Sequence, residues 1–130
     1  MKRNLDLIRR MMQALEQNSD LNGRSSHSCY ASELFELPDH SDDELAYNLM
    51  QILDEGWLEG EYVEVSGNFI VKRLTADGHD FIDSTKDPDR WEKAKSMAKT
   101  ASGESLRFVL EAAKGLARAE LAKWMGGMLP

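Results

Sequence analysis

Three histidines and a single cysteine are the side chains best suited to bind a metal or to act in catalysis. They are His27, Cys29, His40 and His79. His27 and Cys29 stand only two positions apart, and the sequence has no Cys-x-x-Cys or His-x-x-x-His pair of the kind found in zinc sites. A Cys–His nucleophilic pair would need a third group to orient its base, and the spacing supplies none. We therefore predict no metal site, no cofactor and no catalytic residues.

The block TADGHD, residues 75–80, combines a histidine with two carboxylates and is the strongest remaining case for acid–base chemistry. A structural role accounts for it better. Gly78 lets the backbone approach a neighbouring element, and His79 can bond a backbone carbonyl or a carboxylate while its ring packs. Two acidic sets, one of which overlaps this block, could form carboxylate pairs or cation sites, but helix starts and solvated faces explain them more simply. These sets are Asp42, Asp43 and Glu44, and Asp77, Asp80 and Asp83.

The length and composition fit one compact domain with an appended element. The chain has 130 residues, of which 42% are hydrophobic, and this is enough to build a core. A lone cysteine cannot form an intramolecular disulfide, and the N-terminal residues do not resemble a signal peptide. The sequence also lacks an apolar run of about 18 residues that could span a membrane. We predict a cytoplasmic protein without membrane contact.

The net charge of −7 is distributed unevenly along the chain. Between Asp20 and Asp83 there are 15 acidic residues and only three basic ones, whereas from Ser84 onward nine basic residues face six acidic ones. DNA binding relies on Lys and Arg that replace the counterions of the phosphates. The central part of the chain should therefore be repelled by DNA, and only the ends could attract it.

Apolar residues at helical spacing predict an amphipathic helix over Asn4–Gln17. Residues 18–28 are rich in Ser, Asn and Gly and are predicted to form a loop. The segment Tyr30–Leu37 allows two interpretations, a short strand that pairs with a later hairpin or a single helical turn ended by Pro38. The strand is favoured.

The next predicted helix has a start, a buried face and a stop. Ser41 is a suitable N-cap, and the three acids that follow it interact favourably with the helix dipole. Gly56 stands where a left-handed residue ends a helix, and Trp57 can then pack back on Ile52. The predicted buried stripe is Leu45, Leu49, Ile52 and Leu53, and the opposing face is Glu44, Tyr47, Asn48, Gln51 and Glu55.

A hairpin and a further helix follow. Alternating residues predict a strand at Glu61–Val65, Ser66-Gly67-Asn68 supplies a turn, and Phe69–Leu74 returns as an apolar strand. Thr75 can cap the next helix. Together with the preceding helix, this pattern predicts an α+β, mostly α, winged helix-turn-helix-like domain over residues 1–86, in which the hairpin is the wing.

A helical extension is predicted over residues 87–130. Asp87-Pro88 opens a helix, because Pro at the first helical position is preorganised. Ser102-Gly103 is expected to break it before a final helix over Glu104–Met125. The apolar stripe of that helix is longer than one small domain easily covers, so we expect it to pair with another helix, for example from a second copy. The stripe is Leu106, Val109, Leu110, Ala113, Leu116, Ala117, Leu121 and Trp124.

Several blocks of the chain resemble one bacterial and phage family. The blocks are MKRNLDLIRR (1–10), ELAYNL (44–49), EGWLEG (55–60), RLT (73–75) and GHDFID (78–83), continued by Trp91, Lys93 and Lys95. The sequence resembles the family called domain of unknown function 2513, and the block Leu-Thr-x-x-Gly-His-x-Phe is the most specific part of the likeness. The resemblance implies a small winged-helix-like protein of prophages and mobile elements, with no assigned activity. Asn48 stands where such sequences often have His.

A winged-helix outline suggests nucleic-acid binding, but the acidic charge of the central helix opposes it, and the expected function follows from this conflict. Asn and Gln can read adenine in the major groove, but base readout needs phosphate anchors nearby, and the neighbouring residues are acidic. We predict a non-enzymatic regulator or adaptor of phage or prophage type that contacts a basic protein partner, with a homodimer through the last helix. The predicted contact residues are Asp42, Asp43, Glu44, Tyr47, Asn48, Gln51 and Glu55.

The competing hypothesis is a dimeric winged-helix transcription regulator that binds DNA. Because the central helix lacks Lys and Arg, the positive charge would have to come from the N-terminus and the base of the hairpin. The residues available for this role are Lys2, Arg3, Arg9, Arg10, Lys72 and Arg73.

Overall fold

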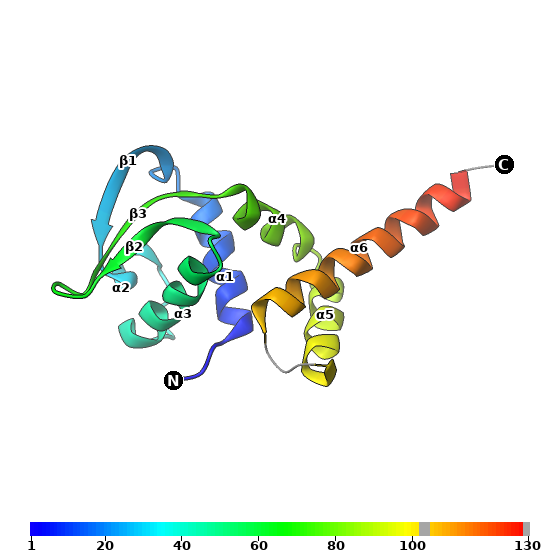
Figure 1. The fold of residues 1–130 in the computed structure, drawn as a ribbon, viewed down its shortest axis with the longest axis horizontal. Coiled ribbons are helices and arrows are strands. Elements are labelled where there is room, and N and C mark those ends of the chain that lie inside the picture. The colour runs from blue at the N-terminus through cyan, green and yellow to red at the C-terminus, as the bar shows by residue number, and fades with distance from the viewer. Residues whose placement is uncertain (102–104, 129–130) are drawn as a thin grey trace. The chain divides into compact units, whose positions relative to one another are not determined.

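The computed structural model describes residues 1–101 and 105–128. Over these residues the fold is α+β and mostly helical, with one small antiparallel sheet (Figure 1). This confirms the α+β, mostly helical class predicted from the sequence. The contacts divide the chain into two compact units, Met1–Ile82 and Asp83–Pro130.

The first unit contains the sheet and the helices around it. In chain order its elements are α1 (Leu5–Gln17), β1 (Asn22–Cys29), α2 (Ala31–Leu34), α3 (Asp42–Asp54), β2 (Leu58–Val63), β3 (Asn68–Leu74) and α4 (Ala76–Ser84), which ends just past the boundary. The sheet order is β1-β3-β2, and both pairs are antiparallel. The hairpin β2–β3 and the helices α1 and α3 were predicted, but β2 covers Leu58–Val63 instead of Glu61–Val65.

The helix α1 forms because one of its faces is apolar and its first turn is capped. The Asn4 side chain accepts a hydrogen bond from the Leu7 backbone N–H at 3.1 Å. Six apolar side chains of α1 are buried, and they provide one side of the core. They are Leu5, Leu7, Ile8, Met11, Met12 and Leu15.

The predicted loop over residues 18–28 is wrong, because Asn22–Cys29 forms the edge strand β1. The strand lacks an apolar alternation, and its side chains are exposed or half-buried. It is added to the sheet through its pairing with β3, with an irregular register between Asn22 and His27. This segment therefore forms a strand because β3 pairs with it, and the residue pattern of a single sequence does not reveal that pairing.

The predicted strand at Tyr30–Leu37 is also wrong, since Ala31–Leu34 is the short helix α2. The Glu33 carboxylate accepts a hydrogen bond from the Tyr30 backbone N–H at 3.0 Å, which closes the first turn. Asp42 of α3 accepts from the Ser32 backbone N–H at 2.9 Å. These local side-chain bonds favour the helical turn, which was the second of the two interpretations.

Both ends of α3 match the prediction. Ser41 accepts from the Glu44 backbone N–H at 3.2 Å. At the other end Gly56 has φ +73°, and the Gly56 and Trp57 N–H groups donate back to Leu53 and Ile52. These are the two bonds of a Schellman C-cap, which satisfy carbonyls that the helix end leaves unpaired.

A tight junction joins the end of α3, the start of β2 and the start of α4. The Thr75 hydroxyl donates to the Gly56 carbonyl at 2.6 Å and accepts from the Gly78 N–H at 3.1 Å. A Cβ added at Gly78 would overlap the Trp57 carbonyl oxygen. Buried Trp57 in turn stacks on Phe81, with ring centroids 4.3 Å apart. The predicted cap at Thr75 and the close approach at Gly78 are both present.

The second unit is built on α5 (Pro88–Ala101) and α6 (Leu106–Met128), which pack along one another. Asp87 caps α5 by accepting from the N–H groups of Asp89 and Arg90. The bond from the Arg90 N–H is the main cause that holds the pKa of the Asp87 carboxyl below its ordinary value. The predicted break at Ser102-Gly103 lies outside the described residues.

Within residues 1–101 and 105–128, no helix combines the length and the apolar character needed to cross a bilayer.

Candidate functional site

The predicted contact residues of α3 occupy different environments in the structure. Asp42 and Asp43 are exposed, whereas Glu44, Tyr47, Gln51 and Glu55 are half-buried. The remaining one, Asn48, has no exposed surface.

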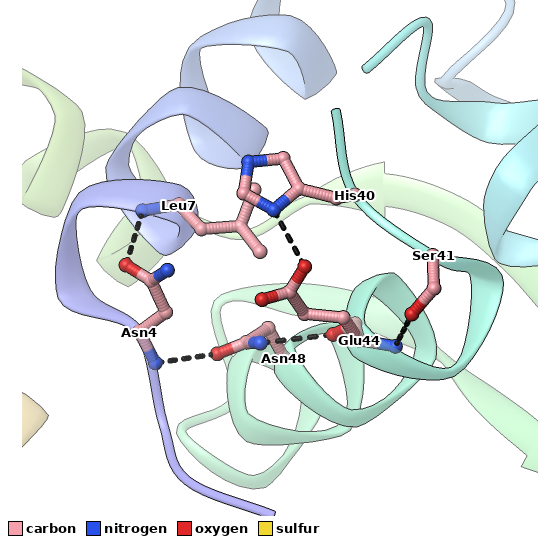
Figure 2. A network of polar contacts seen from close by, with 6 residues as sticks. All are labelled: Asn4, Leu7, His40, Ser41, Glu44 and Asn48. Atoms are coloured by element: carbon pink, nitrogen blue, oxygen red, sulfur yellow. Dashed lines mark hydrogen bonds and ion pairs between the residues drawn. The ribbon is translucent and has the colours of Figure 1, made fainter. Parts of the chain in front are cut away.

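The placement of Asn48 on the exposed face is wrong, because this side chain ties α3 to the start of α1 (Figure 2). Its amide N–H donates to the Glu44 carbonyl at 2.9 Å, and its amide oxygen accepts from the Asn4 backbone N–H at 2.9 Å. Asn4 is also the cap of α1. Asn48 is therefore a buried structural residue and cannot contact a partner.

The chain itself also covers the side of α3 next to Asn48. His40 Nδ1 lies 2.6 Å from Glu44 Oε1 (Figure 2), and Arg3 donates to the Gln51 side-chain oxygen at 3.1 Å. The segments before α1 and before α3 thus occupy the face that the sequence pattern had assigned to a partner. This contact joins residues 48 positions apart, so helical periodicity could not reveal it.

Asn48→Leu is expected to lower the free energy of unfolding by about 2 kcal/mol, because it leaves the Asn4 N–H and one bond of the Glu44 carbonyl unmade in a buried place. Urea denaturation followed by circular dichroism measures the change. Gln51→Leu is the matched control on the same helix, and its half-exposed bond should cost less than about 1 kcal/mol. Equal losses in the two variants would contradict the structural role of Asn48.

The face of α3 that remains open is a stripe at helical spacing, formed by Asp43, Tyr47, Met50 and Asp54. Beside it lies a groove of about 490 Å³ between α3 and β2. The groove is lined by Met50, Gln51, Leu53, Asp54, Gly60, Glu61 and Tyr62, and we call it the acidic groove. The open stripe of α3 is rotated around the helix axis from the predicted contact face by roughly a quarter turn, at 100° per residue.

The acidic groove combines apolar and negatively charged side chains. Met50, Leu53 and Tyr62 supply apolar surface, and the Tyr62 ring is held against Phe69 with centroids 5.0 Å apart. Asp54 and Glu61 supply exposed carboxylates. From residue 42 to residue 65 the sequence has eight acidic residues and no Lys or Arg. The groove can therefore accept a ligand with apolar anchors and positive charge.

Three of the basic residues of the DNA hypothesis, Arg3, Lys72 and Arg73, contact other side chains of the chain. Glu59 binds Arg73 Nε at 2.7 Å and lies 3.8 Å from Lys72 Nζ. Arg3 is held by Gln51. Lys2 and Arg10 are exposed, and Arg9 is half-buried.

A second, polar cleft of about 230 Å³ contains His79. It is lined by Leu15, Glu16, Asn18, Leu21, Asn22, Arg73, Leu74 and His79. His79 Nδ1 lies 3.7 Å from the Glu16 carboxylate, and its side chain is 53% exposed. The carboxylate partner expected for His79 thus comes from α1, but most of its ring is open to solvent and does not pack.

Cys29 and a possible metal site are the remaining candidates for chemistry. Partial burial, and then the negative charge of Glu33, raise the pKa of the Cys29 thiol, which disfavours the reactive thiolate. Within residues 1–101 and 105–128, no group of three or more His, Cys, Asp or Glu side chains is arranged to hold a metal ion.

The predicted oligomerisation stripe of α6 is buried at its start and exposed at its end. Leu106, Val109, Leu110 and Ala113 are buried, so they are not available to a second copy. Leu116 and Ala117 are half-buried. Leu121 and Trp124 are 54% and 63% exposed, so the exposed apolar surface lies toward the end of the helix.

Taken together, the described residues define a small α+β protein with a three-stranded antiparallel sheet, an acidic groove beside it and a separate helical unit. The chain belongs to the family described as hypothetical protein (DUF2513), whose profile matches residues 2–105. This confirms the resemblance found in the sequence. Comparisons with curated proteins and with solved structures found no match.

Proposed function

We propose that this protein is a non-enzymatic, winged-helix regulator or adaptor of phage or prophage type, and that its acidic groove binds a basic segment of another protein. The competing role, a dimeric DNA-binding regulator, uses the same fold but requires an electropositive surface.

The winged-helix assignment is supported by the order of the elements. The first unit runs α1–β1–α2–α3–β2–β3, and the strand order β1-β3-β2 places the hairpin next to the edge strand β1. In a helix-turn-helix arrangement the second helix is the one that reads a partner, and α3 holds that position after α2. The hairpin β2–β3 corresponds to the wing.

The composition of the acidic groove is the observation that carries the proposal. Apolar surface from Met50, Leu53 and Tyr62 lies next to the carboxylates of Asp54 and Glu61. Buried apolar anchors provide affinity at a protein interface, and charge complementarity provides orientation and a fast association rate. The same carboxylates would face the phosphates of DNA, which opposes binding in the manner of a recognition helix.

A peptide titration tests the proposal. The probe is a fluorescently labelled helical peptide of Leu, Lys and Trp, and the control probe carries Glu in place of Lys. We expect the basic peptide to bind, salt to weaken the binding, and the double variant Asp54→Lys/Glu61→Lys to weaken it about tenfold or more. Fluorescence anisotropy measures each affinity.

The matched control variant is Asp20→Lys/Glu36→Lys, which makes the same change of charge at two exposed positions outside the groove. It should bind the basic peptide about as well as the natural chain. A loss of affinity equal to that of the groove variant would show non-specific attraction and would overturn the proposed site. Binding of the Glu peptide with the same affinity as the basic peptide would also overturn the proposed site.

A parallel titration with mixed-sequence duplex DNA at low salt separates the two roles. We expect weak binding, because the described cations at the base of the hairpin are paired with Glu59. Tight binding that is lost in Arg9→Ala, Arg10→Ala or Arg73→Ala variants would instead establish the DNA-binding role.

A further inference from the structure

A short segment before α1 reaches the edge of the acidic groove. Residues 1–4 precede α1, and we call them the leading segment. Arg3 donates from Nε to the side-chain oxygen of Gln51 at 3.1 Å, and Gln51 is one of the residues that line the groove. The chain therefore places one of its own guanidinium groups beside the site that we assign to a basic ligand.

The leading segment is anchored to α3 at Asn4, the residue after Arg3 (Figure 2). The Asn4 N–H donates to the Asn48 amide oxygen at 2.9 Å, and Asn48 has no exposed surface. The Asn4 side chain also caps α1. Both bonds are made without the Arg3 side chain, so the anchor stays in place when Arg3 changes its contact.

The contact between Arg3 and Gln51 is more open to solvent than this anchor. Both side chains are half-buried, and the neighbouring Lys2 is exposed. The net contribution of a hydrogen bond in such a place corresponds to about a fivefold change in an equilibrium constant. A contact of this strength holds Arg3 at the groove and still allows another group to take its place.

Arg3 has the same charge as the expected ligand. The groove itself exposes the carboxylates of Asp54 and Glu61, and the sequence from residue 42 to residue 65 has no Lys or Arg. A cation beside α3 must therefore come from another part of the chain or from another molecule. Arg3 is a cation of the first kind, and a basic partner segment supplies the second.

We propose that Arg3 is an internal competitor for the acidic groove, and that a cationic side chain of the partner displaces it from Gln51. The competition rests on the proposed function, since it describes how the same groove is regulated. The two cations exclude one another because like charges brought to one side chain repel.

The competitor belongs to the same molecule as the groove, so dilution does not remove it. Asn4 keeps Arg3 within reach of Gln51, and a group on so short a tether has a high effective concentration. Every ligand that requires Gln51 is weakened by the same factor. A ligand that leaves Arg3 in place is not weakened, so the leading segment changes which ligands the groove selects.

Two variants that each remove one positive charge test the competition. The probe is the labelled basic peptide of Leu, Lys and Trp, and fluorescence anisotropy measures its affinity. Arg3→Ala should raise the affinity about fivefold, because it removes the competitor. Lys2→Ala removes the same charge one position earlier and should raise the affinity less than about twofold. Circular dichroism verifies that both variants are folded.

A double-variant cycle tests whether the effect depends on Gln51. Gln51→Leu removes the acceptor of the Arg3 bond, so the two contacts cannot be lost independently. In the Gln51→Leu background, Arg3→Ala should change the affinity for the peptide by less than about twofold. A fivefold gain in that background would overturn the competition at Gln51.

NMR of the natural chain observes the displacement directly. The Nε–H signal of Arg3 is assigned by its absence from Arg3→Ala. On saturation with the basic peptide it should move toward the signal of Arg24, which is exposed and serves as the unchanged reference. An Arg3 signal that stays in place at saturation would show that the ligand does not displace it, and the competition would be wrong.

The affinities separate the competition from the proposed function. Equal gains in Arg3→Ala and Lys2→Ala would reveal a general effect of charge and would overturn the competition. A loss of affinity in Arg3→Ala would do so as well, because Arg3 would then help to bind the partner. If the natural chain and Arg3→Ala bind the peptide equally, the competition fails and the proposed function stands. If neither binds the peptide, both fail.

Discussion

Gly78→Ala is expected to lower the free energy of unfolding by about 3 kcal/mol, although helix propensity alone favours Ala over Gly by roughly 1 kcal/mol. Gly78 lies in the first turn of α4, where an added methyl group would overlap the backbone carbonyl oxygen of Trp57. A backbone atom cannot move aside as the end of a flexible side chain can. Relief of the overlap would disturb the Thr75 bonds that hold α4 to the end of α3.

A second helical glycine serves as the control for the expected loss of stability in Gly78→Ala. Gly115 lies inside α6, and apart from the backbone of its own helix and its chain neighbours, no atom of the described residues lies within 4 Å of an added Cβ. Gly115→Ala should therefore stabilise the protein by roughly 0.5–1 kcal/mol through helix propensity. Urea denaturation of both variants gives the two values. A neutral or stabilising Gly78→Ala would show that α4 does not approach Trp57 as closely as described.

Trp57→Ala is expected to lower the free energy of unfolding by about 3–5 kcal/mol. The side chain is 1% exposed and stacks on Phe81, so its removal leaves a cavity at the junction of α3, β2 and α4. The surrounding backbone is fixed by the bonds of Thr75 and by the C-cap of α3, which limits collapse into the cavity. Urea denaturation measures the loss.

Two controls separate the cavity from other effects of Trp57→Ala. Val65→Ala truncates a fully exposed side chain of the same unit and should change stability by less than about 0.5 kcal/mol. Trp57→Phe keeps an aromatic ring against Phe81 and should lose less than Trp57→Ala. A Trp57→Ala variant as stable as Val65→Ala would place Trp57 outside the core.

The elements with strong local signals were predictable from the sequence. The helix α3 has a capping Ser41, an apolar stripe and a left-handed Gly56, and each of these acts within a few residues. The hairpin β2–β3 has a turn with Gly67 at φ +76°. The strand β1 had no such signal, because its Ser-rich sequence becomes a strand only through its pairing with β3.

The charge of the candidate site was also predictable, but its location on α3 was not. Counting residues is enough to find that 42–65 is acidic and without Lys or Arg. Helical spacing placed Asn48 and Gln51 on the open face, yet Asn4 and Arg3 bind these two side chains. Contacts between residues more than 40 positions apart have no periodic signature in a single sequence.

The sequence by itself determined the capped ends of α3, the presence of the hairpin and its turn, the acidic charge of the central region and the family of this chain. Each of these depends on residue types at short spacing. Only the tertiary structure decided which face of α3 is covered, which strand completes the sheet and which part of α6 is exposed. These features depend on which segments meet, because burial and pairing arise from the packing of distant parts of the chain.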